Sequence, residues 1–168
     1  MPYTPYHFGP GLLLKSASPR WISIVGFAGA NIAVDCEVLF NDLRAYHPVH
    51  GLMHTIPFAG PIGLFSGILS VLVVRRWFPR VAAHPLLRGD LTIAAGAIGG
   101  FLGGATHPLL DAIGRKGTHP LWPWSQANPL FRLVPFWWLL GLCVASGVLG
   151  YWILKVRMRP ATTAQVEA

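Results

Sequence analysis

Four long apolar runs constrain this sequence more than any other feature. They cover residues 21–40, 55–74, 91–113 and 134–156. A helix needs about 20 residues to cross the hydrocarbon core of a bilayer, so each run is long enough. All four are apolar around the whole helix, which excludes the two-faced helices of a soluble domain. The sequence therefore predicts an all-α membrane protein with about four transmembrane helices.

The charge content supports a membrane protein and excludes two other classes. Charged residues make up only 11% of the chain and hydrophobic residues 53%, whereas soluble domains average about 25% charged residues. Disordered chains need low hydrophobicity and high charge, so that class is excluded as well. The net charge of +7 would suggest nucleic acid as a partner of a soluble protein. Here the basic residues lie between the apolar runs, so we expect the lipid bilayer and no nucleic acid as partner.

The two ends of the chain differ from the four runs. Residues 1–15 contain an apolar stretch that is too short to cross a membrane, and we expect it to form a short N-terminal half-helix against the rest of the protein. We expect residues 1–158 to form a single transmembrane helical domain. Residues 159–168 are predicted to be a disordered C-terminal tail.

The distribution of basic residues predicts the orientation. Nine Lys and Arg residues lie before the first run, between the second and third, or at the end of the fourth, and four lie in the other two loops. The positive-inside rule then places both termini in the cytoplasm. Residues 41–54 and 114–133 are then predicted to face outward.

Acidic and imidazole side chains gather at the predicted outer ends of three runs. Asp35 and Glu37 lie late in the first run, His50 and His54 precede the second, and His107 and Asp111 lie late in the third. Ionisable groups near the hydrocarbon are costly and are usually functional. The alternative is that the first helix ends near residue 34 and both acids lie in water.

This convergence predicts a metal site. His50–His54 and His107–Asp111 are both spaced i,i+4, so each pair would share one face of a helix. Histidine and carboxylate ligands suit a divalent metal, with zinc the first choice and manganese the alternative. Asp35 and Glu37 are two residues apart and cannot both point at one ion from a regular helix. Glu37 is therefore predicted to be a catalytic base or to orient a ligand histidine.

Four strings in this order resemble a known family: TPYHFGPGLLLK, VDCE, HGLMHT and THPLLDAIG. The sequence resembles the predicted membrane-bound, metal-dependent hydrolases of bacterial inner membranes, the LexA-regulated inner-membrane hydrolase type. That family has an early histidine, a D-x-D pair, an H-R-x-x-T-H-S block and a late H-x-x-x-D. This chain departs from it by Glu37 in the second acidic position and by Gly51 where arginine is usual.

The resemblance implies a metal-dependent hydrolase. The family is in turn similar to zinc-dependent phospholipase C and to zinc single-strand nucleases, in which a further histidine follows the H-x-x-x-D. Here His107, Asp111 and His119 follow that order. The implied reaction is hydrolysis of a phosphoester, and the substrate could be a lipid. The candidate catalytic residues are Glu37 and His119, and the candidate metal ligands are His7, Asp35, His50, His54, His107 and Asp111.

A second function class fits the same residues. Histidines on different helices of a four-helix membrane protein can hold haem, with His54 and His107 as the axial ligands, or carry a metal without catalysis. The carboxylates Asp35 and Asp111 would then lie beside the haem without a compensating charge, which favours the hydrolase.

Overall fold

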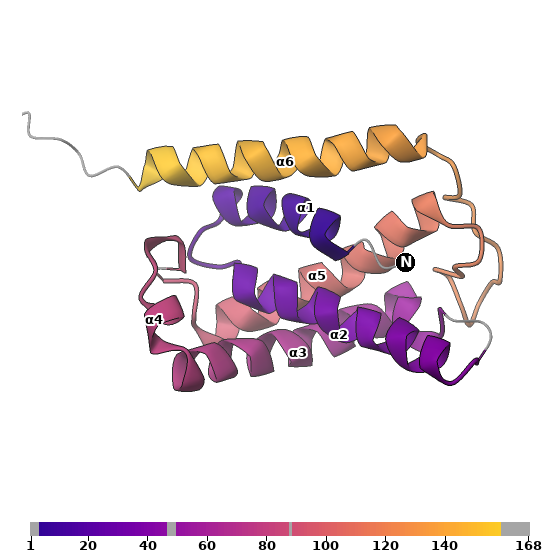
Figure 1. The fold of residues 1–168 in the computed structure, drawn as a ribbon, viewed down its shortest axis with the longest axis horizontal. Coiled ribbons are helices and arrows are strands. Elements are labelled where there is room, and N and C mark those ends of the chain that lie inside the picture. The colour runs from indigo at the N-terminus through magenta and orange to yellow at the C-terminus, as the bar shows by residue number, and fades with distance from the viewer. Residues whose placement is uncertain (1–3, 47–49, 88, 159–168) are drawn as a thin grey trace, which may run out of the picture.

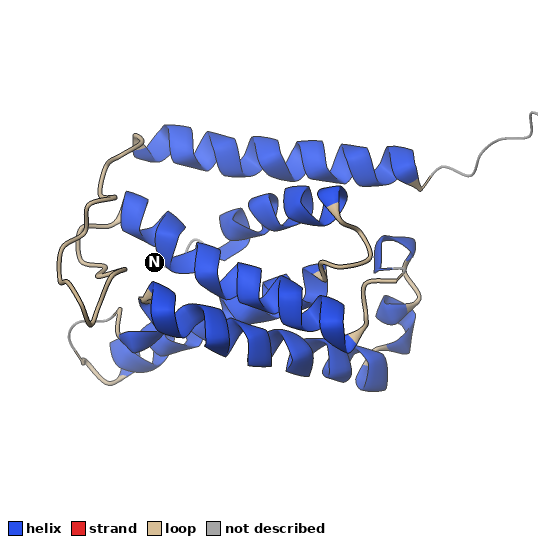
Figure 2. Cartoon of the chain, turned by 180° about the vertical axis from the view of Figure 1, so that it is seen from behind, coloured by secondary structure: helices blue, strands red, loops and turns tan. Residues whose placement is uncertain are grey.

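The computed structural model describes residues 4–46, 50–87 and 89–158 (Figure 1). Every regular element in these residues is a helix (Figure 2). The predicted tail at residues 159–168 lies outside the described residues.

Four helices are long and apolar enough to cross a membrane, as the sequence predicts. They are α2 (Ile24–Leu43), α3 (Ile56–Trp77), α5 (Ile93–Gly114) and α6 (Phe136–Arg157). Two of them begin at side-chain caps, because Ser23 accepts a hydrogen bond from the Gly26 amide and Thr92 accepts one from Ala95. The shorter elements are α1 (Thr4–Ala17), η1 (Leu52–His54), α4 (Pro79–Ala82) and η2 (Pro85–Leu87).

The helices form two packed groups. Helix α5 packs on both α3 and α2, while α1 packs mainly on α6 (Figure 1). The first group is held by glycine contacts. A side chain at Gly100 would overlap the Gly63 carbonyl and would lie 2.7 Å from the Gly67 Cα. The glycine-rich third run is therefore the surface on which α3 and α5 approach closely.

Helix α1 is the predicted N-terminal half-helix. Its 14 residues span about 21 Å, too short for a hydrocarbon core of about 30 Å. A side chain at Gly150 of α6 would lie 2.5 Å from the Leu13 amide nitrogen of α1, so the two backbones are close.

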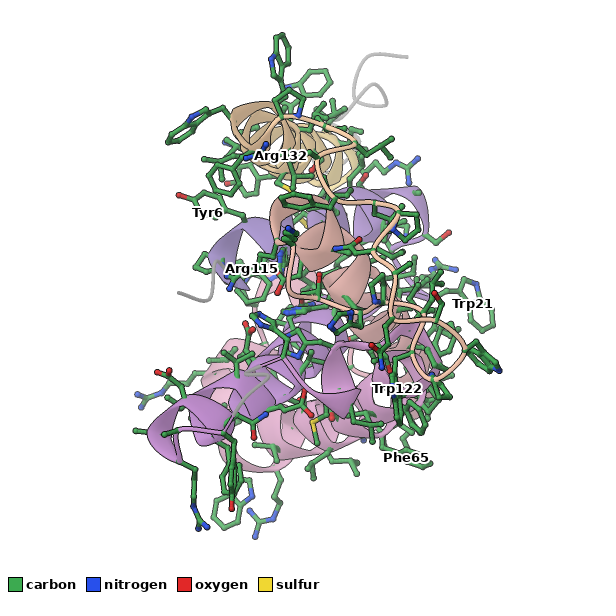
Figure 3. The ribbon with its side chains drawn as sticks, turned by 90° about the vertical axis from the view of Figure 1, so that its right-hand side faces the viewer. Tyr6, Trp21, Phe65, Arg115, Trp122 and Arg132 are labelled. Atoms are coloured by element: carbon green, nitrogen blue, oxygen red, sulfur yellow. The ribbon has the colours of Figure 1, made fainter. Side chains whose placement is uncertain are left out.

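Many large apolar side chains point outward, whereas many of the buried residues are small or polar. Phe65 and Trp137 are 71% and 76% exposed, and Phe65 extends away from the bundle in Figure 3. Buried positions on α5 are instead mostly glycine and alanine, together with His107 and Asp111. An apolar exterior of this extent fits a lipid environment.

Candidate metal centre

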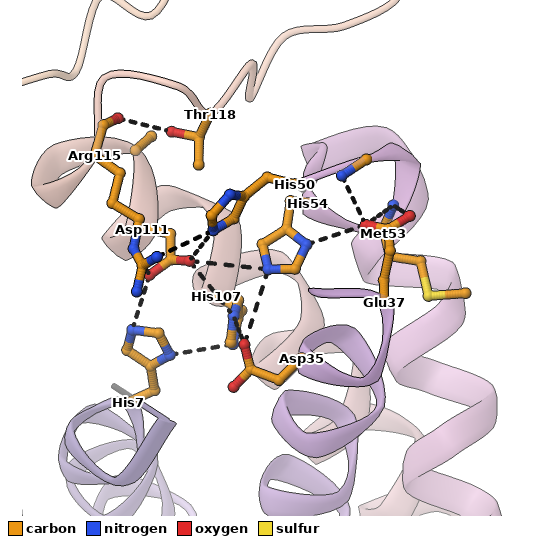
Figure 4. Close-up of polar contacts among 12 residues, drawn as sticks. His7, Asp35, Glu37, His50, Met53, His54, His107, Asp111, Arg115 and Thr118 are labelled. Carbon is orange, nitrogen blue, oxygen red and sulfur yellow. Dashed lines mark hydrogen bonds and ion pairs between the residues drawn. The ribbon is translucent and has the colours of Figure 1, made fainter. Parts of the chain in front are cut away.

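All six predicted ligands lie together at one end of the bundle (Figure 4). They come from four separate parts of the chain: α1, α2, the segment that includes η1, and α5. Three overlapping groups each have their ligand atoms within 4.8 Å of one another, namely His7–His107–Asp111, Asp35–His54–His107 and His50–His54–Asp111. The convergence that the topology predicts is therefore present in the structure.

His54 is oriented by Glu37. Its Nδ1 lies 3.1 Å from Glu37 Oε2. A carboxylate can only accept, so Nδ1 carries the proton and Nε2 has a free lone pair. The same carboxylate accepts from the Gly51 and Met53 amides at 3.0–3.1 Å. Glu37 thus holds the loop before α3 and sets the tautomer of His54, an arrangement common around metal-bound histidines.

His107 is oriented by Asn31, a residue that the sequence reasoning missed. The Asn31 amide nitrogen donates to the Phe27 carbonyl at 2.8 Å, so its Oδ1 points toward His107. His107 Nδ1 lies 2.9 Å from that oxygen and donates to it. Its Nε2 then carries the lone pair. Asn31 precedes Asp35 by one helical turn. Its polar side chain inside an apolar run is the sequence signal that could have identified it as a functional residue.

The two free imidazole nitrogens test whether a metal fits. His54 Nε2 and His107 Nε2 are buried, and neither has a hydrogen-bond partner among the described residues. Asp35 Oδ1 lies 3.3 Å from the nitrogen of His107 and 3.9 Å from that of His54. Asp111 Oδ2 lies 3.9 Å and 3.8 Å from the same two atoms. Two imidazole nitrogens and two carboxylates face one another, and this donor set fits a divalent metal.

His7 completes the cluster from α1. Its Nδ1 lies 3.1 Å from His107 Nδ1. His107 Nδ1 has one proton, which Asn31 accepts, so this contact does not fix the tautomer of His7. The other ring nitrogen of His7, Nε2, lies 3.7 Å from Asp111 Oδ1. The side chain is only 8% exposed, so the N-terminal helix closes one side of the cluster.

His50 and Arg115 lie on the loop side of Asp111. His50 Nε2 is 3.7 Å from Asp111 Oδ2, and Arg115 Nε is 3.7 Å from Oδ1. Burial, reinforced by the neighbouring His54, lowers the pKa of His50 to about 4. The ring is therefore neutral at physiological pH, and its Nε2 lone pair accepts a hydrogen bond from Arg115 Nη1 at 3.3 Å. Arg115 lies near the centre of this end of the molecule in Figure 3.

The helical spacing expected for His50 and His54 is wrong. His50 lies before η1, and His54 is the last residue of that short 3₁₀ helix. Pro57 at the start of α3 favours a helix that begins after His54. The rings still meet, with centroids 4.8 Å apart, because the loop is folded around Glu37. The i,i+4 pair of His107 and Asp111 does lie on one helix, α5, as expected.

Asp35 and Glu37 do not lie in open water. Their side chains are 12% and 13% exposed, and α2 continues to Leu43. The alternative of a helix that ends near residue 34 is wrong. The two acids diverge as their spacing requires, since Asp35 faces the histidine cluster and Glu37 faces the loop.

His119 lies outside the three ligand groups. Its Nδ1 donates to the Gln126 carbonyl at 2.6 Å. It lines a cavity of about 250 Å³ together with His50, Thr55 and Trp122. The structure therefore places His119 beside the centre, across a cavity that His50 also borders.

Comparison with known proteins gives the family. A family model described as "YdjM inner membrane protein" matches residues 10–166. The chain belongs to the YdjM inner membrane protein family. It is a multi-pass inner membrane protein with a YdjM-type sequence over nearly its whole length. Five of the six predicted ligands lie inside the matched segment, and His7 precedes it. Neither curated proteins nor solved structures give a match.

Proposed function

We propose that this YdjM family member is a membrane-embedded, metal-dependent hydrolase that acts on phosphoesters. The observation that carries the proposal is the pair of buried Nε2 atoms of His54 and His107, which have no hydrogen bond and face two carboxylates. Such a cluster has no evident structural use, because unpartnered polar atoms destabilise a membrane interior. It has an evident use as a metal site.

The candidate ligands are the same six that the sequence predicts, with zinc as the first choice and manganese as the alternative. A bound divalent ion would act as a Lewis acid and make water a nucleophile near neutral pH. The protein residues then have separate tasks. Asp35, His54, His107 and Asp111 surround the position between the free nitrogens, and His7 and His50 border it from opposite sides.

The remaining polar residues fit the handling of an anionic substrate. Arg115 lies beside Asp111 and His50, where its guanidinium can bind a phosphoryl oxygen. Glu37 holds the proton on His54 Nδ1 and is the candidate base or positioning residue. His119, across the cavity from His50, is the candidate that moves a proton at the leaving group.

A small apolar cavity supports a lipid as substrate. It has a volume of about 70 Å³ and lies between α1, α5 and α6. His7, Asp111 and Arg115 form its polar side, and Leu110, Leu139 and Leu140 are among its apolar lining. A phosphate and the first carbons of an acyl chain match the two sides of this cavity, and the rest of the chain would lie outside it.

The geometry disfavours the haem alternative. The ring centroids of His54 and His107 are 5.2 Å apart, and the rings meet edge to face. A porphyrin would have to lie between them as axial ligands, and the contact leaves no room for one. A metal carrier without catalysis would use the same cluster, so activity must be measured together with metal content.

The test uses the full chain purified in detergent. We expect about one or more zinc or manganese ions per chain by elemental analysis, and hydrolysis of a phospholipid or a soluble chromogenic phosphoester. His54→Ala and Asp111→Ala should lose the metal and at least 100-fold in activity, since ligands of one metal act as a unit. His84→Ala is the matched control, because His84 is exposed at the other end of the bundle. Wild-type protein that holds metal but hydrolyses neither substrate would refute the hydrolase and leave a metal-binding protein.

A further inference from the structure

A second site lies at the end of the bundle opposite the metal centre. Two adjoining cavities of about 830 Å³ and 430 Å³ share Lys15, Leu86 and Leu154 in their walls. They lie between the end of α1, the segment around α4 and η2, and the end of α6 (Figure 1). We call these two cavities the basic groove. It contains none of the residues of the metal centre.

A buried ion pair lies next to the basic groove, and its lysine is the member that lines the groove. Lys15 Nζ lies 2.9 Å from Asp90 Oδ2, and the two side chains are 2% and 0% exposed. Lys15 also donates to the Pro19 carbonyl at 3.2 Å, and Asp90 accepts from the Ile24 amide at 3.1 Å. The pair neutralises itself and ties α1 to the start of α2 and α5. It therefore shapes the groove but adds no net charge to it.

The rim of the groove is positively charged. Arg20, Arg80 and Arg157 are exposed residues in its lining. Arg157 donates from Nη1 to the Ser16 carbonyl at 2.6 Å. The other N–H groups of its guanidinium can still bind a ligand. Arg20 and Arg80 have no hydrogen bond or ion pair within the described part of the chain. No acidic side chain is among the described residues that line either cavity.

Below the rim the walls are apolar. Leu12, Val81 and Leu87 line the smaller cavity, and Trp21, 64% exposed, lies at the edge of the larger one. Tryptophan is favoured at the membrane interface, where one face is apolar and the other wet. The groove thus places arginines at headgroup level above a surface suited to hydrocarbon.

We propose that the basic groove binds an anionic phospholipid of the surrounding membrane. The phosphate would lie among the guanidinium groups of Arg20, Arg80 and Arg157, and an acyl chain would lie along Leu12, Val81 and Leu87. Basic pockets between transmembrane helices are a recurrent form of lipid site. A soluble phosphate would use only the rim and leave the apolar walls unfilled. The site is independent of the proposed hydrolase activity.

The test measures lipid binding to the full chain in detergent by native mass spectrometry. Phosphatidylglycerol should bind at least tenfold more tightly than phosphatidylcholine. Arg20→Gln/Arg80→Gln should lose that preference, while Arg20→Lys/Arg80→Lys should keep part of it because the charge remains. The matched control is Arg44→Gln/Arg132→Gln, which removes two exposed cations from other parts of the chain and should bind as wild type does.

Three results would overturn the proposal. One is equal binding of the two lipids, and another is unchanged phosphatidylglycerol binding by Arg20→Gln/Arg80→Gln. The third is displacement of the lipid by millimolar glycerol phosphate, which would indicate a site for a soluble phosphate. Melting temperatures of all variants in detergent, measured without added lipid, identify a variant that has lost its fold, and the lysine variant then decides the outcome.

Discussion

Asn31 and Glu37 are single residues outside the candidate ligand set that orient its histidines. Each accepts the Nδ1 proton of one histidine and so directs the Nε2 lone pair inward. Without these acceptors, each imidazole would be free to rotate or to change tautomer. Metal affinity should therefore depend on residues that never contact the ion.

The Asn31→Leu variant tests this for His107. The substitution keeps the side-chain volume but removes the acceptor at 2.9 Å. We expect zinc affinity to fall about 10- to 100-fold, as measured by competition with a chromogenic chelator. Asn31→Asp keeps an oxygen acceptor and should retain most of the affinity. Wild-type affinity in Asn31→Leu would show that the hydrogen bond does not orient His107.

The Glu37→Gln variant separates two roles of one carboxylate. Gln keeps an oxygen that can accept from His54 but cannot take up a proton. If Glu37 only positions His54, zinc affinity and activity should fall together, by about tenfold. If it is the base, activity at saturating zinc should fall at least 100-fold while affinity changes little. The measurements are zinc titration and turnover at saturating zinc. Unchanged affinity and unchanged turnover would exclude both the positioning role and the role as base.

At the scale of elements, the contact between α3 and α5 depends on the absence of side chains. Gly100→Ala would drive a methyl group into the Gly63 carbonyl and toward the Gly67 Cα. We expect a loss of about 1–3 kcal/mol of stability, seen as a lower melting temperature in detergent. The added methyl group would clash with backbone atoms of α3, and a backbone atom cannot rotate away from the contact as a side chain can.

Gly141→Ala on α6 is the matched control for that substitution. A Cβ at Gly141 meets nothing within 4 Å, and alanine is the better helix former by about 1 kcal/mol. Its melting temperature should stay the same or rise. Equal melting temperatures for both variants would show that α3 and α5 are not held by close backbone contact.

At the scale of the whole molecule, the unequal distribution of basic residues predicts which end faces outward. The test places single cysteines at Gly117 and at His84, both exposed, in a chain whose Cys36 and Cys143 are replaced by serine and alanine. A membrane-impermeant maleimide should label position 117 in intact cells and position 84 only after lysis. The reverse pattern would place the metal centre at the cytoplasmic face.

The whole-molecule view also separates what the sequence can predict from what it cannot. Apolar runs of membrane length predict α2, α3, α5 and α6 because lipid leaves the backbone no alternative to a helix. Chain direction then brings Asp35, His54 and His107 to one end without any knowledge of packing. The sequence does not predict which helices pack together, because small residues occur in several runs and any of these runs permits close contact.

Two details of the structure show this limit. The loop that carries His50 is shaped by hydrogen bonds to Glu37 from amides that the sequence cannot distinguish from others. Lys15 and Asp90 are far apart in the chain, so their ion pair follows from the docking of α1 and not from spacing. In both cases a long-range contact, and no local preference, decides the geometry.

The pairing of α1 with α6 has a consequence for the order of assembly. The ribosome makes α1 before α6, yet each is the other's main neighbour. Newly made α1 therefore lacks its main packing partner until α6 has been translated. His7 lies on α1, so a chain that stops before α6 would lack the main packing that supports His7 beside His107.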